Sequence, residues 1–416
     1  MSFRFFYGWV IVAASFTILT LAYGVQFSYG VFLPHIMRDL ELDRVAATAP
    51  FSLYVLVYTV TAFISGRATD RFGPRAVVLT GAGMLGLGYV LLSTAKAEWH
   101  IFLFLSLITG IGMSAVFVPV NATVVRWFLR RRGSALAISG TGVNAALLVG
   151  PMLAAVIIPW LGWRTGLMTM AIAAAVAIAA CALTLVRDPE LRNLSPDGEG
   201  PDQHGGDGAV SSEVSRTLAE AVSSSAFWVI TGVYILTWIM LFFPFVHLPI
   251  MAAELGYDAT RAASLVAAMG AGGIIGRVFF GWLSDRIGRV PCLYVSLVTE
   301  VVAFMLFTQS ASLTTLYIAA GLFIAGSSSA TSLYPAVIAD CFGRGHIGAI
   351  SGVSFSIAGG AAAVGPLLAG LIRDLTGTYE MAFVLGAALN ITAIIFLVFL
   401  RIPQKNCFYP ACWNIS

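Results

Sequence analysis

The chain has 416 residues, of which 59% are hydrophobic and only 10% are charged, and its mean hydropathy is +0.90. Soluble domains carry about 25% charged residues, so this composition predicts an integral membrane protein. The formal net charge of +3 is small, and the basic residues lie between apolar runs, which argues against nucleic acid as a partner. The five cysteines have no metal-ligand spacing, so neither a metal nor a cofactor is expected.

Twelve apolar runs follow one another along the chain. A helix of about 20 apolar residues crosses the hydrocarbon core of a bilayer, and only helices or closed barrels can do so. The first run has no small-residue cleavage site after it, so we interpret it as a membrane span rather than a signal peptide. The fold class predicted is therefore an all-α membrane protein with twelve transmembrane helices. The runs cover residues 8–33, 46–66, 76–96, 100–125, 134–158, 165–186, 226–247, 262–284, 290–310, 313–339, 347–372 and 380–400.

One long polar stretch separates the sixth run from the seventh. Its first part, beginning at Pro189, is rich in glycine, proline, serine and acidic residues, which predicts a disordered linker. The segment RTLAEAVSSSAFW that follows is amphipathic and predicts a helix on the membrane surface. The expected organisation is an N-terminal six-helix half (1–187), a cytoplasmic linker with a surface helix (188–225), a C-terminal half (226–401) and a tail (402–416).

Most of the 23 basic residues fall on the side of the membrane that holds the N-terminus, if the runs alternate in direction. Lys and Arg accumulate on the cytoplasmic side of membrane proteins. Both termini and the linker are therefore expected in the cytoplasm, with the protein in the cell (inner or plasma) membrane.

Sequence segments repeat between the two halves. GRATDRFGPR at 66–75 and GWLSDRIGRV at 281–290 share Gly, Asp-Arg and Gly at the same spacing, and AISG occurs at 137–140 and at 349–352. Repeats of six spans that fall on the same side of the membrane predict two parallel halves related by a pseudo-twofold axis.

The first of these segments resembles the loop signature of the major facilitator superfamily, G-x-x-x-D-R-x-G-R/K. The matching residues are Gly66, Asp70, Arg71, Gly73 and Arg75, with a degenerate copy at Gly281, Asp285, Arg286, Gly288 and Arg289. FYGWVIVAASF, RWFLRRRGSALAISGTG and LGWRTG further resemble bacterial monocarboxylate transporters and the related oxalate–formate antiporters. The resemblance implies a twelve-helix carrier with a substrate site near the middle of the membrane.

The repeated loop predicts a gate on the cytoplasmic side. Gly66 would allow a close approach between helices, and Asp70 could accept hydrogen bonds from a helix N-terminus and a nearby arginine. Asp285 and Arg286 belong to the second copy of this gating motif. The alternative is an ordinary basic loop with turn residues, but the repetition of the spacing favours the gate.

Arg277 lies inside the eighth run, ~12 Å from its cytoplasmic end at 1.5 Å per residue. A guanidinium at this depth costs ~2.5–3.5 kcal/mol on insertion scales, which makes it a functional-site hypothesis. Gly270 and Gly273 share its helix face and would leave room beside it. The guanidinium fork matches a carboxylate, so a small organic anion is the expected guest. An internal salt bridge or a snorkelling side chain is the alternative.

The resemblance implies the same role, because monocarboxylate transporters carry an arginine in this helix that holds the substrate carboxylate. The sequence also departs from the family. Phe27 stands where animal members have a lysine, Gly273 stands where they have an aspartate, and the eleventh run lacks the basic residue of the oxalate–formate antiporters. A single buried positive charge favours a monoanion over a dicarboxylate.

Glu300 is the one acidic residue well inside a predicted span. It lies ~14 Å along the ninth helix, nearly level with Arg277. It could pair with Arg277 in the empty carrier or take a coupling proton. The favoured alternative is a site outside the cavity, where the carboxyl is protonated or bonded to a neighbour, because the ninth helix of this superfamily lies there.

Further side chains are expected to shape the substrate cavity. Tyr334 and Asn121 are the best candidates, since hydrocarbon would leave their polar groups without partners. For each aromatic residue alone, helix packing is the simpler role. The remaining candidates are Tyr23, Phe27, Asn144, Ser354 and Phe355.

The sequence contains no nucleophile–base pair and no cofactor fingerprint, so an enzyme is not expected. The predicted function is secondary transport of a lactate- or pyruvate-like monocarboxylate together with a proton, by alternating access and as a monomer. Two alternatives stay open. One is exchange of organic anions of the oxalate–formate type, and the other is a transporter-like carboxylate sensor without net flux.

Overall fold

The computed structural model describes residues 6–198, 215–309, 312–362 and 364–400. The expected C-terminal tail and most of the linker lie outside these ranges. All regular secondary structure in the described residues is helical, which confirms the predicted fold class.

The first half of the chain forms a run of long helices. Residues Glu98–Trp127 are continuous helix, because the π-helix η1 joins α4 to α5. Helix α6 contains Gly162 at a φ of 72°, outside the helical region, so it consists of two helices in succession. The bounds are α1 (Gly8–Asp39), α2 (Arg44–Phe72), α3 (Pro74–Ser93), α4 (Glu98–Ile101), η1 (Phe102–Thr109), α5 (Gly110–Trp127) and α6 (Arg132–Thr184).

The second half repeats the arrangement with two of its spans divided. The seventh predicted run is formed by α8 and α9, and the eleventh by α13 and α14. The bounds are α8 (Ser225–Ile239), α9 (Phe243–Glu254), α10 (Ala259–Ile287), α11 (Arg289–Thr308), α12 (Leu313–Phe342), α13 (Ile347–Ala362), α14 (Val364–Thr376) and α15 (Glu380–Val398).

By length and composition, ten helices among the described residues could each cross a membrane. Dividing α6 at Gly162 and joining α13 to α14 accounts for all twelve predicted runs. Several helices exceed their apolar runs. For example, α1 continues to Asp39, past Pro34, because a helix can extend beyond the hydrocarbon core while its backbone remains hydrogen-bonded.

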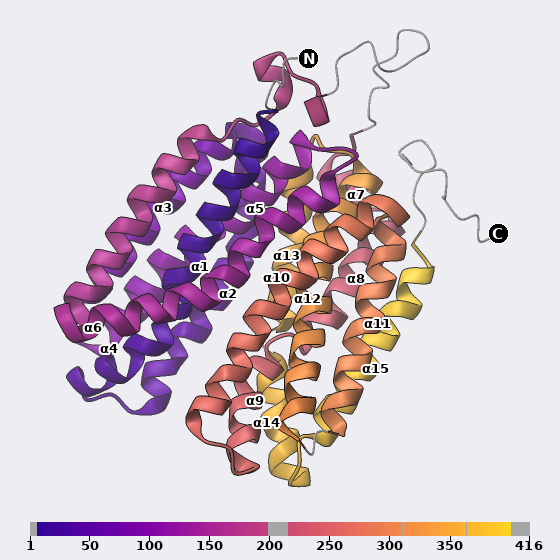
Figure 1. Ribbon diagram of the computed structural model, residues 1–416. Coiled ribbons are helices and arrows are strands. Elements are labelled where there is room, and N and C mark those ends of the chain that lie inside the picture. The colour runs from indigo at the N-terminus through magenta and orange to yellow at the C-terminus, as the bar shows by residue number, and fades with distance from the viewer. Residues whose placement is uncertain (1–5, 199–214, 310–311, 363, 401–416) are drawn as a thin grey trace, which may run out of the picture.

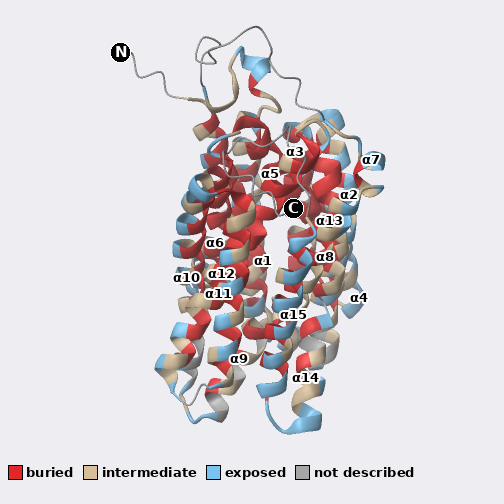
Figure 2. Ribbon diagram, turned by 90° about the vertical axis from the view of Figure 1, so that its right-hand side faces the viewer, coloured by how far each residue is buried: buried red, intermediate tan, exposed pale blue. Residues whose placement is uncertain are grey.

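The helices form two bundles that lie side by side, with α1–α6 in one and α8–α15 in the other (Figure 1). Buried residues concentrate inside and between the bundles, and exposed residues follow the outer helix faces (Figure 2). Many of these exposed residues are large and apolar, such as Ile275, Val278 and Phe279 on α10. An apolar outer surface is what a lipid environment requires.

The linker is more ordered at its start than the sequence predicts. Residues Pro189–Arg192 and Pro196–Gly198 form short 3-10 turns, η2 and η3. The Asp197 carboxylate accepts backbone N–H bonds from Leu129 and Arg130 at 3.0 and 2.8 Å, which fixes this segment against the α5–α6 loop. The expectation of disorder is therefore wrong for residues 189–198. The surface helix is α7 (Leu218–Val222), which starts at a capping box of Thr217 and Glu220.

Candidate functional site

The two halves meet at the end of the molecule that holds the repeated loops, which we call the latch end. Asp70, in the last turn of α2, accepts the backbone N–H groups of Gly348 and Ala349 at 3.1 and 2.7 Å. These groups lie at the start of α13, so the carboxylate interacts with the positive end of that helix. Arg126 of α5 donates to Asp70 at 2.9 Å. Asp70 thus connects the first half to the second.

The two glycines of this loop are needed for different geometric reasons. A Cβ added to Gly66 would lie 2.0 Å from the carbonyl oxygen of Gly348, so only glycine permits this approach of α2 to α13. Gly73 has a φ of 84° and Gly288, its counterpart, has a φ of 94°. Both positions favour glycine because a Cβ is strained in that region. The motif therefore encodes contact and turn geometry at the same time.

Asp285 makes the equivalent contact on the other side of the interface. It accepts the backbone N–H groups of Gly133 and Ser134, both at 2.9 Å, at the start of α6. Gly281 permits the close approach here, since an added Cβ would lie 2.3 Å from the Ala137 side chain. The two aspartates of the repeat thus each hold the first turn of a helix in the opposite half.

Three other motif residues lie away from the interface. Arg71, Arg75 and Arg286 are exposed. Arg71 lies over the ring of Phe72 at 5.1 Å, and Arg286 lies over the ring of Trp282 at 4.1 Å. The expectation that these arginines take part in closing the gate is not supported by their placement. Arg71 and Arg286 stack on aromatic side chains at the latch end of their own helices instead.

Sequence reasoning missed the ion pairs that complete the latch end. Arg126 also donates to Asp188 at 2.8 Å and to the carbonyl of Gly345 at 2.7 Å. Asp340, at the end of α12, accepts from Arg132 at 3.0 Å and from Arg289. In the sequence Arg126 and Arg132 count only among the basic residues expected on the cytoplasmic side, and only the fold shows their acidic partners.

Arg277 is buried between the halves, with 4% of its surface exposed. Its Nη1 donates to the hydroxyl of Ser332 on α12 at 3.0 Å, and its Nε has no partner among the described residues. No described carboxylate pairs with it. Gly140 of α6 lies against the guanidinium, because a Cβ added there would be 2.0 Å from Nη1. Among the described residues, neither alternative to a binding role, a salt bridge or snorkelling, is present in this conformation.

The room predicted beside the guanidinium is filled. A Cβ added to Gly270 would meet Leu148 at 2.8 Å, and one added to Gly273 would meet the amide of Asn144 at 1.9 Å. The glycine face of α10 therefore receives side chains of α6, so the expectation of free space at this face is wrong for this conformation. Asn144, a predicted cavity residue, makes this helix contact, and its Oδ1 is unpartnered in the described part of the chain.

Tyrosine side chains from both halves lie near Arg277. The hydroxyl of Tyr23 interacts electrostatically with Arg277 and with Tyr58 and Tyr234, which the sequence did not single out. Phe27 packs on Tyr23 with ring centroids 5.8 Å apart. Tyr23 of α1 and Tyr234 of α8 thus bring one phenol from each half of the chain into electrostatic interaction with the guanidinium.

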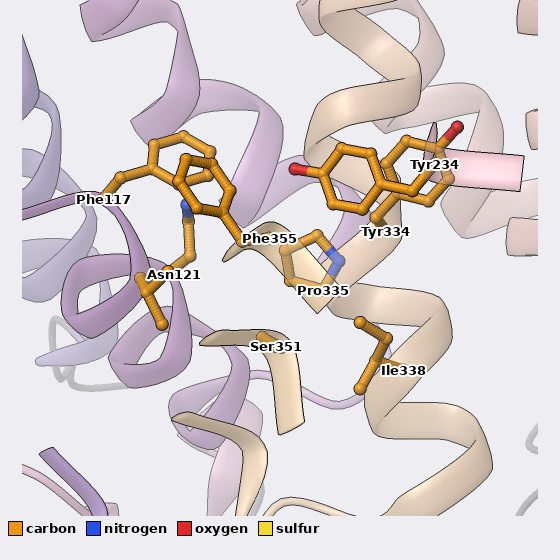
Figure 3. A pocket seen from close by; sticks show the side chains of 9 residues that line it. Phe117, Asn121, Tyr234, Tyr334, Pro335, Ile338, Ser351 and Phe355 are labelled. Atoms are coloured by element: carbon orange, nitrogen blue, oxygen red, sulfur yellow. The ribbon is translucent and has the colours of Figure 1, made fainter. Parts of the chain in front are cut away.

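A small cavity of about 10 Å³ lies between the halves, with room for about one water molecule (Figure 3). Three residues that the sequence predicts at the substrate cavity line it, namely Asn121, Tyr334 and Phe355. Arg277 does not line it. The Tyr334 hydroxyl is hydrogen-bonded to Thr237 at 2.9 Å. The full lining is Phe117, Val118, Asn121, Tyr234, Tyr334, Pro335, Ile338, Ser351 and Phe355.

Two predicted residues have other surroundings. Ser354 is fully buried and shares a hydrogen bond with Thr231 of α8 at 2.9 Å, so its hydroxyl faces helix packing rather than the cavity. Glu300 is 1% exposed, both of its carboxyl oxygens lack a partner among the described residues, and it forms no ion pair with Arg277. It lies against Gly326, where an added Cβ would meet its Cγ at 2.7 Å. Pairing of Glu300 with Arg277 is therefore wrong for this conformation.

The two helical halves are in contact at the latch end, and the cationic side chain of Arg277 is buried between them. This arrangement defines a membrane transporter built on internal repeats. The chain belongs to the Major Facilitator Superfamily, because the model of that family matches residues 15–298 and 227–407. The protein is thus a multi-pass transporter and not an enzyme.

Relatives and solved structures agree with this assignment. The chain is 27% identical over 412 residues to monocarboxylate transporter 13 of Bos taurus, covering 97% of this chain and 91% of that protein. It is 26% identical to monocarboxylate transporter 11 of Homo sapiens, covering 98% and 84%. The human organic anion transporter MFSD10 has the same fold, with a TM-score of 0.71, 18% identity and coverage of 94% and 99%. The Escherichia coli fucose:proton symporter FucP matches with a TM-score of 0.70, 17% identity and coverage of 94% and 98%.

Proposed function

We propose that this protein carries small monocarboxylates of the lactate or pyruvate type across the cell membrane, together with a proton, by alternating access. The observation that carries the proposal is the buried Arg277, which has one hydroxyl partner and no described carboxylate partner. Burying a charge without a counter-ion costs several kcal/mol. A substrate carboxylate would supply the missing charge and accept two donors of the guanidinium fork.

The chemistry around Arg277 supports a small monoanion. A dicarboxylate would bring two negative charges to one positive charge, and no second cation lies beside Arg277 among the described residues. The tyrosine hydroxyls and the Ser332 hydroxyl can bond polar groups next to the carboxylate, and Phe27 offers an apolar surface. The names of the relatives from cattle and humans support the same substrate class.

The interface suggests how binding would be coupled to movement. Gly140 is both a contact between the halves and the immediate neighbour of the guanidinium. With the latch end in the cytoplasm, the closed latch corresponds to a carrier that faces outward. A carboxylate that binds Arg277 changes the charge at the contact between α6 and α10, so the halves can rock around the site. One chain supplies both halves, so a monomer is sufficient.

Transport by the purified protein in liposomes tests this function against its alternatives. Accumulation of lactate or pyruvate that requires an inward pH gradient supports proton-coupled transport. Uptake that requires an internal organic anion and ignores the pH gradient would show exchange instead. Binding without flux in either assay would show a sensor and would contradict the proposal.

A further inference from the structure

Glu300 is a buried acid that the proposed substrate site does not use. It lies on α11 and is 1% exposed. Neither carboxyl oxygen has a hydrogen-bond partner in the described part of the chain. An ionised carboxylate in such a place lacks both a counter-ion and water, and its free-energy cost is large enough that the group takes up a proton instead. In this conformation the side chain is therefore a neutral carboxylic acid.

Few groups could stabilise a charge on Glu300. The phenol of Tyr334 on α12 is the titratable side chain with a described electrostatic interaction with it. On α15, Asn390 lies at a level similar to that of Glu300. Gly386, one turn before Asn390, packs on Phe304, and Phe304 lies one turn after Glu300. The amide of Asn390 is uncharged and its Oδ1 is also unpartnered among the described residues, so it makes no hydrogen bond with Glu300 in this conformation. The cationic Arg277 lies across α12.

The helix α12 connects Glu300 to the substrate site. On one side, Ala325 packs closely against Gly276 of α10. A Cβ added to Gly276 would lie 2.4 Å from the Ala325 Cα. On the other side the next residue, Gly326, receives Glu300. One turn and a half further along, Ser332 accepts the hydrogen bond from Arg277. The three contacts use small residues, so α12 is held closely by α10 and α11 and any shift of α12 changes both environments.

We propose that Glu300 is the proton-binding group of this carrier, and that α12 couples its protonation to the state of Arg277. This inference rests on the proposed function and extends it. The carboxyl carries a proton in the conformation closed at the latch end. When a carboxylate binds Arg277 and the halves rock, α12 shifts against α11, water reaches Glu300, and the proton leaves to the cytoplasm. The empty carrier then returns with the carboxylate ionised and takes up the next proton from the outside.

Replacement of Glu300 by glutamine tests the inference, because glutamine has the shape of the protonated acid and cannot release a proton. One proton carried with each anion converts a gradient of about one pH unit into about tenfold accumulation, since each tenfold ratio is about 1.4 kcal/mol. Glu300→Gln is expected to abolish accumulation driven by the pH gradient. Exchange of labelled for unlabelled substrate at equal pH should stay within about twofold of the unaltered protein, because exchange needs no net proton movement.

Two controls accompany this variant. Glu98→Gln removes an exposed acid, and Ser296→Ala removes a buried hydroxyl one turn before Glu300 on α11. Both should keep the full response to the pH gradient. Unchanged gradient-driven accumulation by Glu300→Gln would overturn the inference. A parallel loss of accumulation and exchange in a well-folded variant would also overturn it, because that result indicates a packing role.

A spectroscopic measurement tests the protonation state without transport. Infrared difference spectra of the unaltered protein minus Glu300→Gln at neutral pH should show the C=O band of a protonated carboxyl, and its absence would contradict the inference. Other results would show that the proposed function itself fails. Loss of the pH response in the unaltered protein would remove proton coupling, and with it the role of Glu300. Normal transport by Arg277→Lys would remove the carboxylate site and its coupling to Glu300, while Glu300→Gln would still report whether Glu300 binds the transported proton.

Discussion

The α6–α10 and α2–α13 interfaces are built from the same repeat but carry different chemistry. Gly140 and Gly352 end the two copies of AISG, and each lies against a helix of the opposite half. Gly140 meets the guanidinium of Arg277. Gly352 meets the backbone of Ala62 and Phe63, with an added Cβ 2.9 Å from the Ala62 carbonyl oxygen and from the Phe63 Cα. Ala62 is the counterpart of Arg277 in the repeat, so duplication supplies the contact surface twice and the charge once.

A similar difference separates the two contacts at the latch end. Asp70 and Asp285 each accept two N–H groups from the first turn of an opposing helix. Among the described residues, an arginine is hydrogen-bonded to the carboxylate of Asp70 and none to that of Asp285. That residue, Arg126, also reaches Gly345 of the other half and Asp188 after α6. The two contacts should therefore contribute unequally to the closed state.

Replacement of each aspartate by asparagine measures this inequality and should give the largest effects. Asp70→Asn leaves Arg126 without one charged partner and removes the negative charge from the acceptor of three hydrogen bonds, so it should destabilise the closed latch by about 2–4 kcal/mol. Asp285→Asn should cost less, about 1–2 kcal/mol, because Arg289 attracts this carboxylate without a hydrogen bond among the described residues. Spin-label distances between the halves at the latch end would report the closed fraction. Equal effects, or a larger effect at Asp285, would contradict the comparison.

Adding a methyl group to each interface glycine should separate contact from chemistry. In Gly352→Ala the new Cβ meets rigid backbone, so α2 and α13 must move apart, at a cost of about 1–3 kcal/mol to the closed state. In Gly140→Ala it meets the end of a flexible arginine side chain, so the closed fraction should change less while carboxylate affinity falls. Spin-label distances and binding calorimetry on both variants would check this. A reversed pattern would show that Gly140 serves only helix packing.

The smallest effect is expected at Asp188, beside the linker. Partial burial raises the pKa of its carboxyl, but Arg126 and Arg187 outweigh this and hold the pKa below its ordinary value. Its stabilising contribution is therefore present above the unpaired pKa of about 3.9 and is lost as the pH falls through the lower pKa of the closed state. The closed fraction should be insensitive to this group between about pH 5 and 8.

Asp188→Asn should cost at most about 1 kcal/mol, because the pair is partly exposed to solvent. The same spin-label distances measured against pH would check this expectation. A loss as large as that of Asp70→Asn would indicate that the linker, and not the repeated motif, holds the latch end closed.

Much of the fold could be predicted because hydrophobic runs and a repeated motif are local patterns. The twelve runs follow from hydropathy, and the class of protein is implied by the resemblance of the loop that contains Gly66 and Gly73 to the signature of the superfamily. The motif predicts that Asp70 meets a helix N-terminus and an arginine, and the structure places it there. The partners could not be identified, since Arg126 lies 56 residues further along the chain and its surroundings depend on how the halves dock.

The errors at the site arise from helix rotation and conformation. Ser354 and Phe355 are neighbours in the sequence, yet one faces α8 and the other the cavity, and a small change in helix phase decides which. The sequence predicts space beside Gly273, but Asn144 fills that space when the halves are closed. Tyr234 escapes sequence reasoning because an aromatic residue in an apolar run gives no sign of facing a charge, and Tyr58 because nothing in its run marks its contact with Tyr23.

The most direct test of the account is carboxylate binding by Arg277→Lys. A lysine keeps the charge but loses the planar fork, so lactate or pyruvate affinity should fall by about tenfold to a hundredfold. Arg286→Lys, on the exposed face of the same helix, is the matched control and should bind normally. Calorimetric titration of both variants gives the comparison. Unchanged affinity in Arg277→Lys, with the protein folded, would contradict the central claim that this arginine holds the substrate carboxylate.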